Sequence, residues 1–511
     1  MSYLTYNGKI VQSNHKYVIS VSSAPIFDLV LTFNDIGTDS PVANPSSVSQ
    51  WNAWFDLPTQ GTPFTSATVL GDAVTLSGGS NITLKDFLFG DDAAAGPGLL
   101  SIVDTGCIIN TGYGTFSPDG VYEYGCYNLT TAVFPALTSI GTSSFQNAIS
   151  LTSFTIPNGV SAIPLYAFEN TPITTISIPA SITSIHYTAF QGCINLTGFS
   201  VSGSNSVYSD VSGVLFNKTQ STLISYPEGK VGASYSIPNG VTTIDSYAFK
   251  GRSKPTNITM PNTVTSMGVG AFDFCNKLSS INLSSNLAAI SYQAFTNCSS
   301  LGAITIPASV TSIGIESFRN CGLTSITIPD AVTTILDSAF NNCTKLIDVS
   351  FGSGLTTIGN NSFYSTRLTN IQIPNNVLTI GSDAFSTNPK LTTVSIGNGV
   401  TSIGQSAFYF CSSLGNVTLG NSVQSIGSYA FAFSPITNIT IPASVTSIGD
   451  LAYNQTVPTV YNLYPLTAPN VSTGTFGDYA KPLHIQSSGT SGYNVSPWTN
   501  VAKFSSIIQD L

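Results

Sequence analysis

The sequence predicts a mainly β solenoid of about 13–14 coils, with an N-terminal all-β module and a C-terminal cap. The stretch from Leu301 to Gly322, LGAITIPASVTSIGIESFRNCG, returns from Leu323 as LTSITIPDAVTTILDSAFNNCTK and again from Leu391. An aromatic residue near the end of each copy recurs with every step but one equal to 22 or 23 residues. A fixed period in this range is typical of stacked coils. The aligned aromatic residues are Phe145, Phe168, Phe190, Phe249, Phe272, Phe295, Phe318, Phe340, Phe363, Phe385, Phe408, Phe431 and Tyr453.

The composition excludes several classes of protein. Hydrophobic residues make up 42% of the 511-residue chain and charged residues 8%, so we expect a large core under a neutral surface of Ser, Thr, Asn, Gly and Gln. The net charge is −9 with 15 Lys and Arg and no basic run, which argues against a nucleic-acid partner. The N-terminal residues lack the apolar core of a signal peptide, and no apolar run approaches about 18 residues. We therefore expect neither an ordinary leader nor membrane insertion.

Residues 1–96 do not follow the repeat. Short β-rich runs at 16–21 and 27–33 are separated by turn residues, which favours an all-β module that attaches the chain to a larger assembly. Trp51 and Trp54 within it are interpreted as core anchors, with a stacking platform for a sugar or a partner as the alternative. Residues 97–128 are expected to form a degenerate capping repeat, because the end of a solenoid core must be shielded from water.

Residues 129–457 form the predicted solenoid, and each coil has the same physical pattern. In the coil that starts at Leu323, Ile326 and Ile328 alternate with Thr327, so the two isoleucines are expected to face inward on a strand. A proline then marks a corner, and a second short extended run follows. The recurring phenylalanines are expected to form a stacked column.

A glycine often follows the second run and is expected to occupy a turn with positive φ. It is present at Gly141, Gly268, Gly314, Gly359, Gly381, Gly404, Gly427 and Gly449.

Two segments interrupt or end the array. An insertion at 199–236 has hairpin-like alternation, and insertions in solenoids often individualise binding. Residues 458–511 are expected to form the C-terminal cap, with strands that end in a short amphipathic segment.

Six of the eight cysteines are locked to the repeat, three residues after the aligned phenylalanine. A side chain that keeps the repeat period faces the same way in every coil, so we expect a ladder of buried free thiols in preference to disulfides or metal ligands. The six are Cys193, Cys275, Cys298, Cys321, Cys343 and Cys411.

No catalytic residue, metal site or cofactor is predicted. The three histidines, His15, His186 and His484, lie in three different regions, and the usual zinc, phosphate and acyl-transfer motifs are absent. Asp91 and Asp92 are interpreted as a solvated loop pair, with ion binding as the alternative. The acidic residues of the array make no repeated pair of the kind that glycoside cleavage needs, so a polysaccharide-degrading enzyme is a remote alternative.

The outward positions of the first strand of each coil are the candidate binding surface. Regular hydroxyls and amides at about 4.8 Å spacing could hold a glycan or a polar protein. The alternative is a face that only keeps the solenoid soluble, and a distant third is ice binding. The candidate residues are Thr259, Asn282, Thr305, Thr327, Ser350, Gln372, Ser395, Thr418 and Thr440.

Over about 99–511 the repeat unit LxxIxIPxxVxxIGxxAFxxC resembles the BspA-like, or Treponema-type, leucine-rich repeats. The resemblance implies a leucine-rich-repeat solenoid and a role in surface adhesion, with no catalytic residue to carry over. The insertion and the closing segment SGYNVSPWTNVAKFSSIIQ are also similar to segments of that family. The copy that starts at Leu301 carries the unit on Leu301, Ile304, Ile306, Pro307, Val310, Ile313, Gly314, Phe318 and Cys321, with Ser317 in place of the consensus Ala.

The N-terminus, MSYLTYNGKIVQSNHKYV, is similar to openings of virion proteins encoded by phages and prophages of Bacteroidetes-type bacteria. This resemblance implies synthesis in a reducing host cytoplasm, which agrees with free thiols. The leading hypothesis is thus a non-enzymatic binding protein on a virion surface, in a head or tail fibre or decoration, which recognises a host-surface glycan or protein. Residues 1–96 would contact other virion or surface-assembly proteins, and self-association is possible. The alternatives are a purely structural virion or surface-layer component and an extracellular or cell-surface adhesin.

Overall fold

The computed structural model describes residues 129–456, 462–464, 469–471 and 474–476 with their side chains, and the backbone of the strands outside these ranges. The chain divides into two compact units, Met1–Val231 and Gly232–Leu511, and each is treated by itself. Every regular element in the described residues is a β-strand. These residues contain no helix long and apolar enough to cross a membrane. The predicted mainly β solenoid, of about 13 turns, is confirmed.

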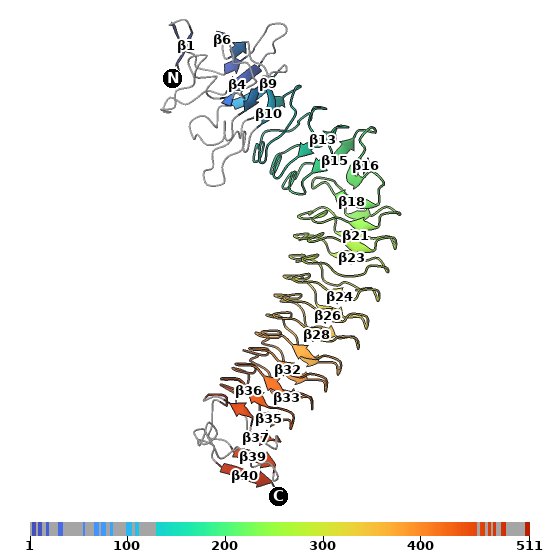
Figure 1. Cartoon of the computed structure of the whole chain (residues 1–511), viewed down its shortest axis with the longest axis vertical. Helices are drawn as coiled ribbons and strands as arrows, with labels where there is room; N and C mark the ends of the chain where they lie inside the picture. Colours follow the sequence, from blue (N-terminus) through green and yellow to red (C-terminus); the bar gives the residue numbers. More distant parts are fainter. Residues whose placement is uncertain are drawn as a thin grey trace. The chain divides into compact units, whose positions relative to one another are not determined.

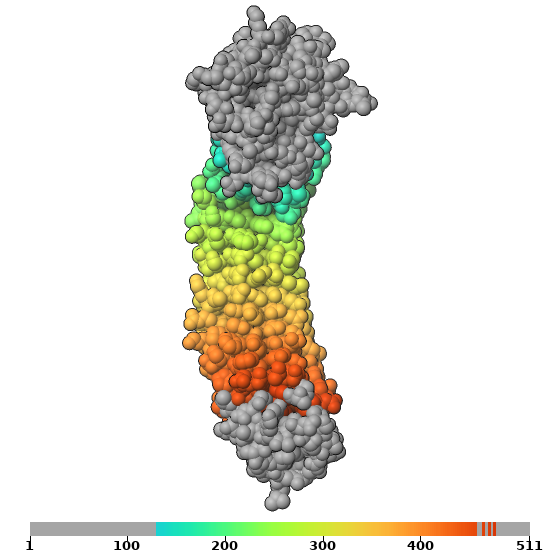
Figure 2. Space-filling model, turned by 90° about the vertical axis from the view of Figure 1, so that its left-hand side faces the viewer, coloured from blue at the N-terminus to red at the C-terminus, as the bar shows by residue number. Residues whose placement is uncertain are grey.

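In the second unit each coil contributes up to two short strands, stacked on those of the next coil (Figure 1). We call the first strand of a coil its leading strand and the second its following strand. Figure 2 shows the surface of these coils as successive bands in sequence order. The leading strands are β19 (Ser234–Ser236), β21 (Asn257–Thr259), β23 (Ser280–Asn282), β25 (Ser325–Thr327), β27 (Asp348–Ser350), β29 (Asn370–Gln372), β31 (Thr393–Ser395), β33 (Asn416–Thr418), β35 (Asn438–Ile441), β37 (Val460–Leu463), β39 (Pro482–Gln486) and β40 (Ser506–Asp510). The following strands are β20 (Thr243–Ile244), β22 (Ser266–Met267), β24 (Ser312–Ile313), β26 (Thr334–Ile335), β28 (Thr357–Ile358), β30 (Thr379–Ile380), β32 (Ser402–Ile403), β34 (Ser425–Ile426), β36 (Ser447–Ile448) and β38 (Asn470–Val471).

The first unit repeats this plan over residues 129–201. Its solenoid strands are β11 (Thr131–Val133), β12 (Ala162–Ile163), β13 (Thr175–Ile178), β14 (Ser184–Ile185) and β15 (Gly198–Val201). The runs predicted at 16–21 and 27–33 contain strands β3 and β4. The strands before the solenoid are β1 (Tyr3–Tyr6), β2 (Lys9–Gln12), β3 (Tyr17–Ile19), β4 (Leu29–Phe33), β5 (Phe55–Asp56), β6 (Ser66–Leu70), β7 (Ala73–Ser77), β8 (Ile82–Leu84), β9 (Leu99–Asp104) and β10 (Ile108–Thr111). The predicted N-terminal module and C-terminal cap, as folded units, and the residues Trp51, Trp54, Asp91 and Asp92 lie outside the described residues.

The insertion is an antiparallel meander that belongs to the core. Its strands are β16 (Tyr208–Val211), β17 (Val214–Asn217) and β18 (Thr222–Ser225), so the predicted hairpin is confirmed. Asn205 is fully buried, and its Nδ2 donates to the carbonyls of Pro179 and Ile182 at 2.7 and 2.9 Å. Tyr226 is also buried. The insertion therefore extends the first unit's core.

The predicted aromatic column is present. In the second unit, successive ring centroids from Phe249 to Phe476 are 4.9 to 5.8 Å apart. Phe318 and Phe340, for example, are 5.2 Å apart with an angle of 6° between their planes. A small residue precedes each ring, as Ala339 does, which leaves room for the stacked aromatic neighbours.

The six repeat-locked cysteines are buried and free, as predicted. They also donate hydrogen bonds, which the sequence interpretation as apolar thiols did not include. The Phe318 carbonyl accepts one bond from the Cys321 amide at 3.0 Å and a second from the Cys343 Sγ of the next coil at 3.0 Å. Burial raises the pKa of the Cys343 and Cys411 thiols to about 12, so these thiols stay protonated.

The expectation of positive φ at the recurring glycines is wrong. None of the eight belongs to the glycines with positive φ among the described residues. At the seven from Gly268 onward, the backbone of the neighbouring coil instead comes too close to leave room for a Cβ. A Cβ at Gly404 would lie 2.5 Å from the Gly381 carbonyl carbon, and one at Gly314 would lie 2.7 Å from the Ile290 oxygen. Glycine is needed here because coil backbones touch.

Candidate functional site

The outward side chains of the leading strands, together with Thr305 at the equivalent position of the coil that starts at Leu301, occupy a set of positions that we call the leading-strand face. Eight of the nine predicted residues on it are exposed, and Thr259 is half-buried. Gln372, Ser395 and Thr418 are register partners on β29, β31 and β33. Thr327 and Ser350 are partners on β25 and β27. The predicted outward orientation is thus confirmed, and binding by these residues stays a prediction.

The leading strands do not make one sheet, whereas the following strands β24 to β38 make an uninterrupted eight-stranded sheet. New leading sheets start at β25, β29 and β35. Each of these strands follows a turn that is one residue short: Leu368 comes five residues after Phe363, whereas Leu346 comes six after Phe340. The coil that starts at Leu301 has no leading strand, although the pattern shared by the coils predicts one at 301–306, and Ile304 in it is half-buried. At β29 and β35 the missing turn residue shifts the strand against its predecessor, so the ladder is interrupted between β27 and β29 and between β33 and β35.

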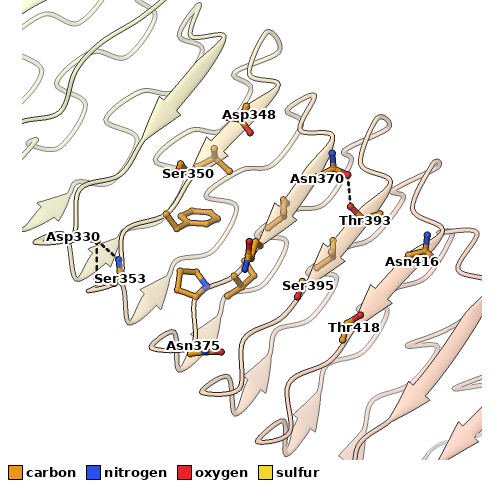
Figure 3. Close-up of a pocket in the computed structure, with 17 residues that line it drawn as sticks. Asp330, Asp348, Ser350, Ser353, Asn370, Asn375, Thr393, Ser395, Asn416 and Thr418 are labelled. Atoms are coloured by element: carbon orange, nitrogen blue, oxygen red, sulfur yellow. Dashed lines mark hydrogen bonds between the residues drawn. The ribbon is translucent and has the colours of Figure 1, made fainter.

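A groove of about 1010 Å³ crosses the interruption between β27 and β29. Its lining includes Ser350 and Phe351 on one side and Gln372 on the other, and it extends over Ser395 and Thr418. Figure 3 shows Ser350, Ser395 and Thr418 on β27, β31 and β33, with Asp348, Thr393 and Asn416 at the other end of the same strands; Asn370 lies on β29, between β27 and β31. We call this cavity the first groove.

The polar groups of the first groove are held in place by bonds between coils. Asn370 Oδ1 accepts hydrogen bonds from the Thr392 and Thr393 hydroxyls of the next coil. Asp330 Oδ1 accepts from the Ser353 amide at 2.7 Å and from the Ser353 hydroxyl at 3.0 Å (Figure 3). These bonds lower the pKa of Asp330, with the backbone bond as the larger cause. The carboxylate is therefore ionised at neutral pH.

A second groove of about 480 Å³ crosses the interruption between β33 and β35. Thr418 and Thr440 line it, together with Pro442 and Tyr464, whose side chain is 44% exposed. Thr418 also lines the first groove, so the two grooves adjoin. Both lie where a short turn interrupts the leading sheets.

The structure thus selects among the predicted residues. Ser350, Gln372, Ser395, Thr418 and Thr440 line grooves, whereas Thr259, Asn282, Thr305 and Thr327 line neither of the two.

Sequence reasoning missed Phe351 and Tyr464 as groove residues. The signals were present for Phe351, because a phenylalanine stands where other coils have a buried isoleucine, such as Ile328 or Ile373. The 22-residue step beside it was a second signal.

Metal and titratable groups add no further site in the described part of the chain. No three His, Cys, Asp or Glu side chains there are grouped to hold a metal ion. Burial lowers the pKa of His186, whose ring Nδ1 lies 2.9 Å from the Thr188 hydroxyl in a local turn. Its imidazole thus has a structural partner.

The fold and this face define a repeat protein whose exposed surface consists of strands and turns, stacked over a hydrophobic core. A model of the BspA type leucine rich repeat region matches residues 118–232, 228–347 and 333–458. These matches cover more than half of the chain, which therefore belongs to the BspA-type leucine-rich-repeat family.

Solved structures with a similar fold include three bacterial proteins. The first is a leucine-rich repeat protein from Eubacterium ventriosum, with 22% identity, 79% of this chain and 94% of that chain covered, and a TM-score of 0.38. The second is a leucine rich cell surface protein from Faecalibacterium prausnitzii, with 22% identity, 75% and 96% covered, and a TM-score of 0.37. The third is the pneumococcal vaccine antigen PcpA, with 16% identity, 87% of each chain covered, and a TM-score of 0.36. No curated protein matches the chain.

Proposed function

We propose that this chain is a non-enzymatic, surface-displayed binding protein, which recognises a glycan or protein of a host surface through the leading-strand face. The observation that carries the proposal is the pair of adjoining grooves on that face, lined by predicted residues such as Gln372 and Thr418. Pre-formed concave sites with a few fixed polar groups are the usual form of a binding site. A face that only keeps the solenoid soluble needs no such grooves.

The proposed setting is a virion, where residues 1–96 attach the chain to other particle proteins as part of a head or tail fibre or decoration. Two observations support it. The first is the resemblance to phage virion proteins that we infer for the N-terminal residues, and the second is the set of six buried free thiols, which suits a chain that folds in a reducing cytoplasm. Mass spectrometry of purified particles from a host that encodes the chain tests this setting. We expect the full chain in the particles, and its absence from them would refute the virion setting.

Binding is tested with the fluorescently labelled full chain on a panel of Bacteroidetes-type cells, measured by flow cytometry. We expect saturable binding to at least one strain. The variant Thr418→Ala should weaken it, because Thr418 lines both grooves. Thr327→Ala is the matched control, since Thr327 is exposed at the equivalent position of β25 and lines neither groove. Absence of binding to every strain, or equal binding by the two variants, would contradict the proposal.

A further inference from the structure

We infer that the two grooves together hold one extended, uncharged glycan chain, with Phe351 and Tyr464 as its stacking surfaces. This inference rests on the proposed binding function and names the ligand class for the same face. It is carried by the connection between the grooves, by the charges of their lining and by the two aromatic side chains.

The connection between the grooves favours a long ligand. The first groove starts at β27, the second ends at β35, and Thr418 lines both. Four coil steps separate the two strands, which corresponds to about 20 Å at the spacing of neighbouring strands. A single small molecule would occupy one groove, whereas a polymer of repeating units can follow successive coils.

The charges of the lining argue against an anionic ligand. Asp330 and Asp348 are the charged residues among those that line the two grooves, and no Lys or Arg is among them. Carboxylates repel sulfated, phosphorylated or uronic-acid sugars, and a basic side chain would be needed to compensate. The other polar groups are hydroxyls and amides, such as those of Ser350, Gln372 and Asn416, which can both donate to and accept from sugar hydroxyls.

The aromatic residues supply the apolar part of such a site. Phe351 replaces an isoleucine that is buried in the neighbouring coils, yet Phe351 itself is half-buried and lines the first groove. Its ring packs edge-on against Phe363 at 5.6 Å and 84°, which fixes its orientation. Tyr464 presents a second partly exposed ring in the second groove. The C–H faces of neutral sugars pack on rings held in this way.

An extended polypeptide is the competing occupant. A peptide that binds tightly is anchored by large apolar or arginine side chains in desolvated pockets. The outward strand positions between the two rings are polar, with Gln372, Ser395 and Thr418 in register. The lining therefore matches a polyhydroxylated chain better than a peptide.

The inference is tested by binding of the full chain to an immobilised glycan panel. The panel contains neutral polymers (mannan, galactan and dextran) and anionic ones (heparin, alginate and polysialic acid). We expect binding to at least one neutral polymer and none to the anionic ones. Binding that is confined to the anionic polymers would overturn the inference.

Three variants locate the site. Phe351→Ile restores the residue found at Ile328 and Ile373, so the coil is expected to fold, and the affinity for the neutral polymer should fall about tenfold. Thr418→Ala should weaken binding about fivefold, through loss of a hydrogen bond. Thr327→Ala should leave the affinity unchanged. A Phe351→Ile variant with unchanged melting temperature and unchanged affinity would refute the assigned site.

The outcomes separate this inference from the proposed function. Cell binding without binding to any neutral polymer keeps the proposed function and refutes the glycan inference. Protease treatment of the cells that abolishes binding would show a protein ligand and also refutes it. If the chain binds neither cells nor polymers, the proposed function and the glycan inference are both refuted.

Discussion

Ser317→Ala is expected to stabilise the second unit. Ser317 is fully buried beside the stacked Phe318, and its Oγ is a buried atom without a hydrogen-bond partner. The equivalent residues of the adjacent coils, Ala294 and Ala339, are fully buried alanines, so the site accepts a methyl group without rearrangement.

The magnitude follows from the buried hydroxyl. An unsatisfied buried hydroxyl costs about 1–3 kcal/mol, so its removal should raise the free energy of unfolding by about 1 kcal/mol. Differential scanning calorimetry should then show a melting temperature roughly 2 °C higher for a unit of this size. Amide exchange around Phe318 should slow about fivefold in the same variant.

The matched control is Ser144→Ala in the first unit. Ser144 occupies the same position of its coil, but its Oγ donates to the Gly141 carbonyl at 2.8 Å. Its removal should lower stability by about 0.5–1.5 kcal/mol, the opposite sign. A lower melting temperature for Ser317→Ala, or the same sign for both variants, would refute the reasoning from hydroxyl satisfaction.

Three further predictions concern the contacts between coils. The pKa values of about 12 for the buried Cys343 and Cys411 thiols lie above the unfolded value of 9.0, so their contribution to stability is complete below pH 9 and is lost as the pH rises from 9 towards 12. Unfolding by denaturant at pH 7.5 and pH 10.5 checks this, and equal free energies of unfolding at the two pH values would contradict it. Gly404→Ala should cost about 1–3 kcal/mol through backbone overlap, whereas Gly302→Ala, with open space at its Cβ, should cost nothing; thermal unfolding compares the two. Asn388→Ala should lower the free energy of unfolding by about 2–4 kcal/mol in the same assay, because the buried Asn388 Nδ2 donates to the carbonyls of Phe363 and Phe385, in adjoining coils, at 2.9 and 2.8 Å. A cost below about 1 kcal/mol would show that these bonds contribute little.

The repeat made most of the fold predictable. A residue that recurs every 22 or 23 positions occupies the same place in each coil, so the Phe318 column, the inward Ile326 and the buried Cys321 could all be read from spacing. The glycine positions were recognised but given the wrong cause. Contact between backbones of adjacent coils, as at Gly404, depends on the rise of the stack, which no single coil encodes.

The site could be predicted in part. Alternation placed Gln372 and Thr418 outward, but it could not distinguish them from Thr327, because the three have the same position in the repeat. The grooves come from a one-residue difference in the turns before Leu368 and Ile436, each of which shifts one strand relative to the previous one. The consequence of such a shift is three-dimensional. The 22-residue spacing can be read from the sequence, but the groove that it produces between two strands cannot.

Bulky residues at positive φ were also beyond the sequence pattern. Phe410 and Phe433 have φ of 55° and 58° at positions where other coils have asparagine, such as Asn320. Both are exposed, and their ring centroids are 6.4 Å apart. Hydrogen bonds between neighbouring coils fix this backbone conformation. The Phe410 amide, for example, donates to the Ala432 carbonyl of the next coil at 2.9 Å. The stack therefore overrides the local preference of the residue.

Hydrogen–deuterium exchange of the full chain, with and without a bound neutral polymer, shows whether the ligand lies in the two grooves. We predict slower exchange at 348–353, 370–375 and 416–421, on both sides of the interrupted leading sheet, with no change at 325–327. Protection confined to segments away from the two grooves, or spread evenly along every leading strand, would contradict it.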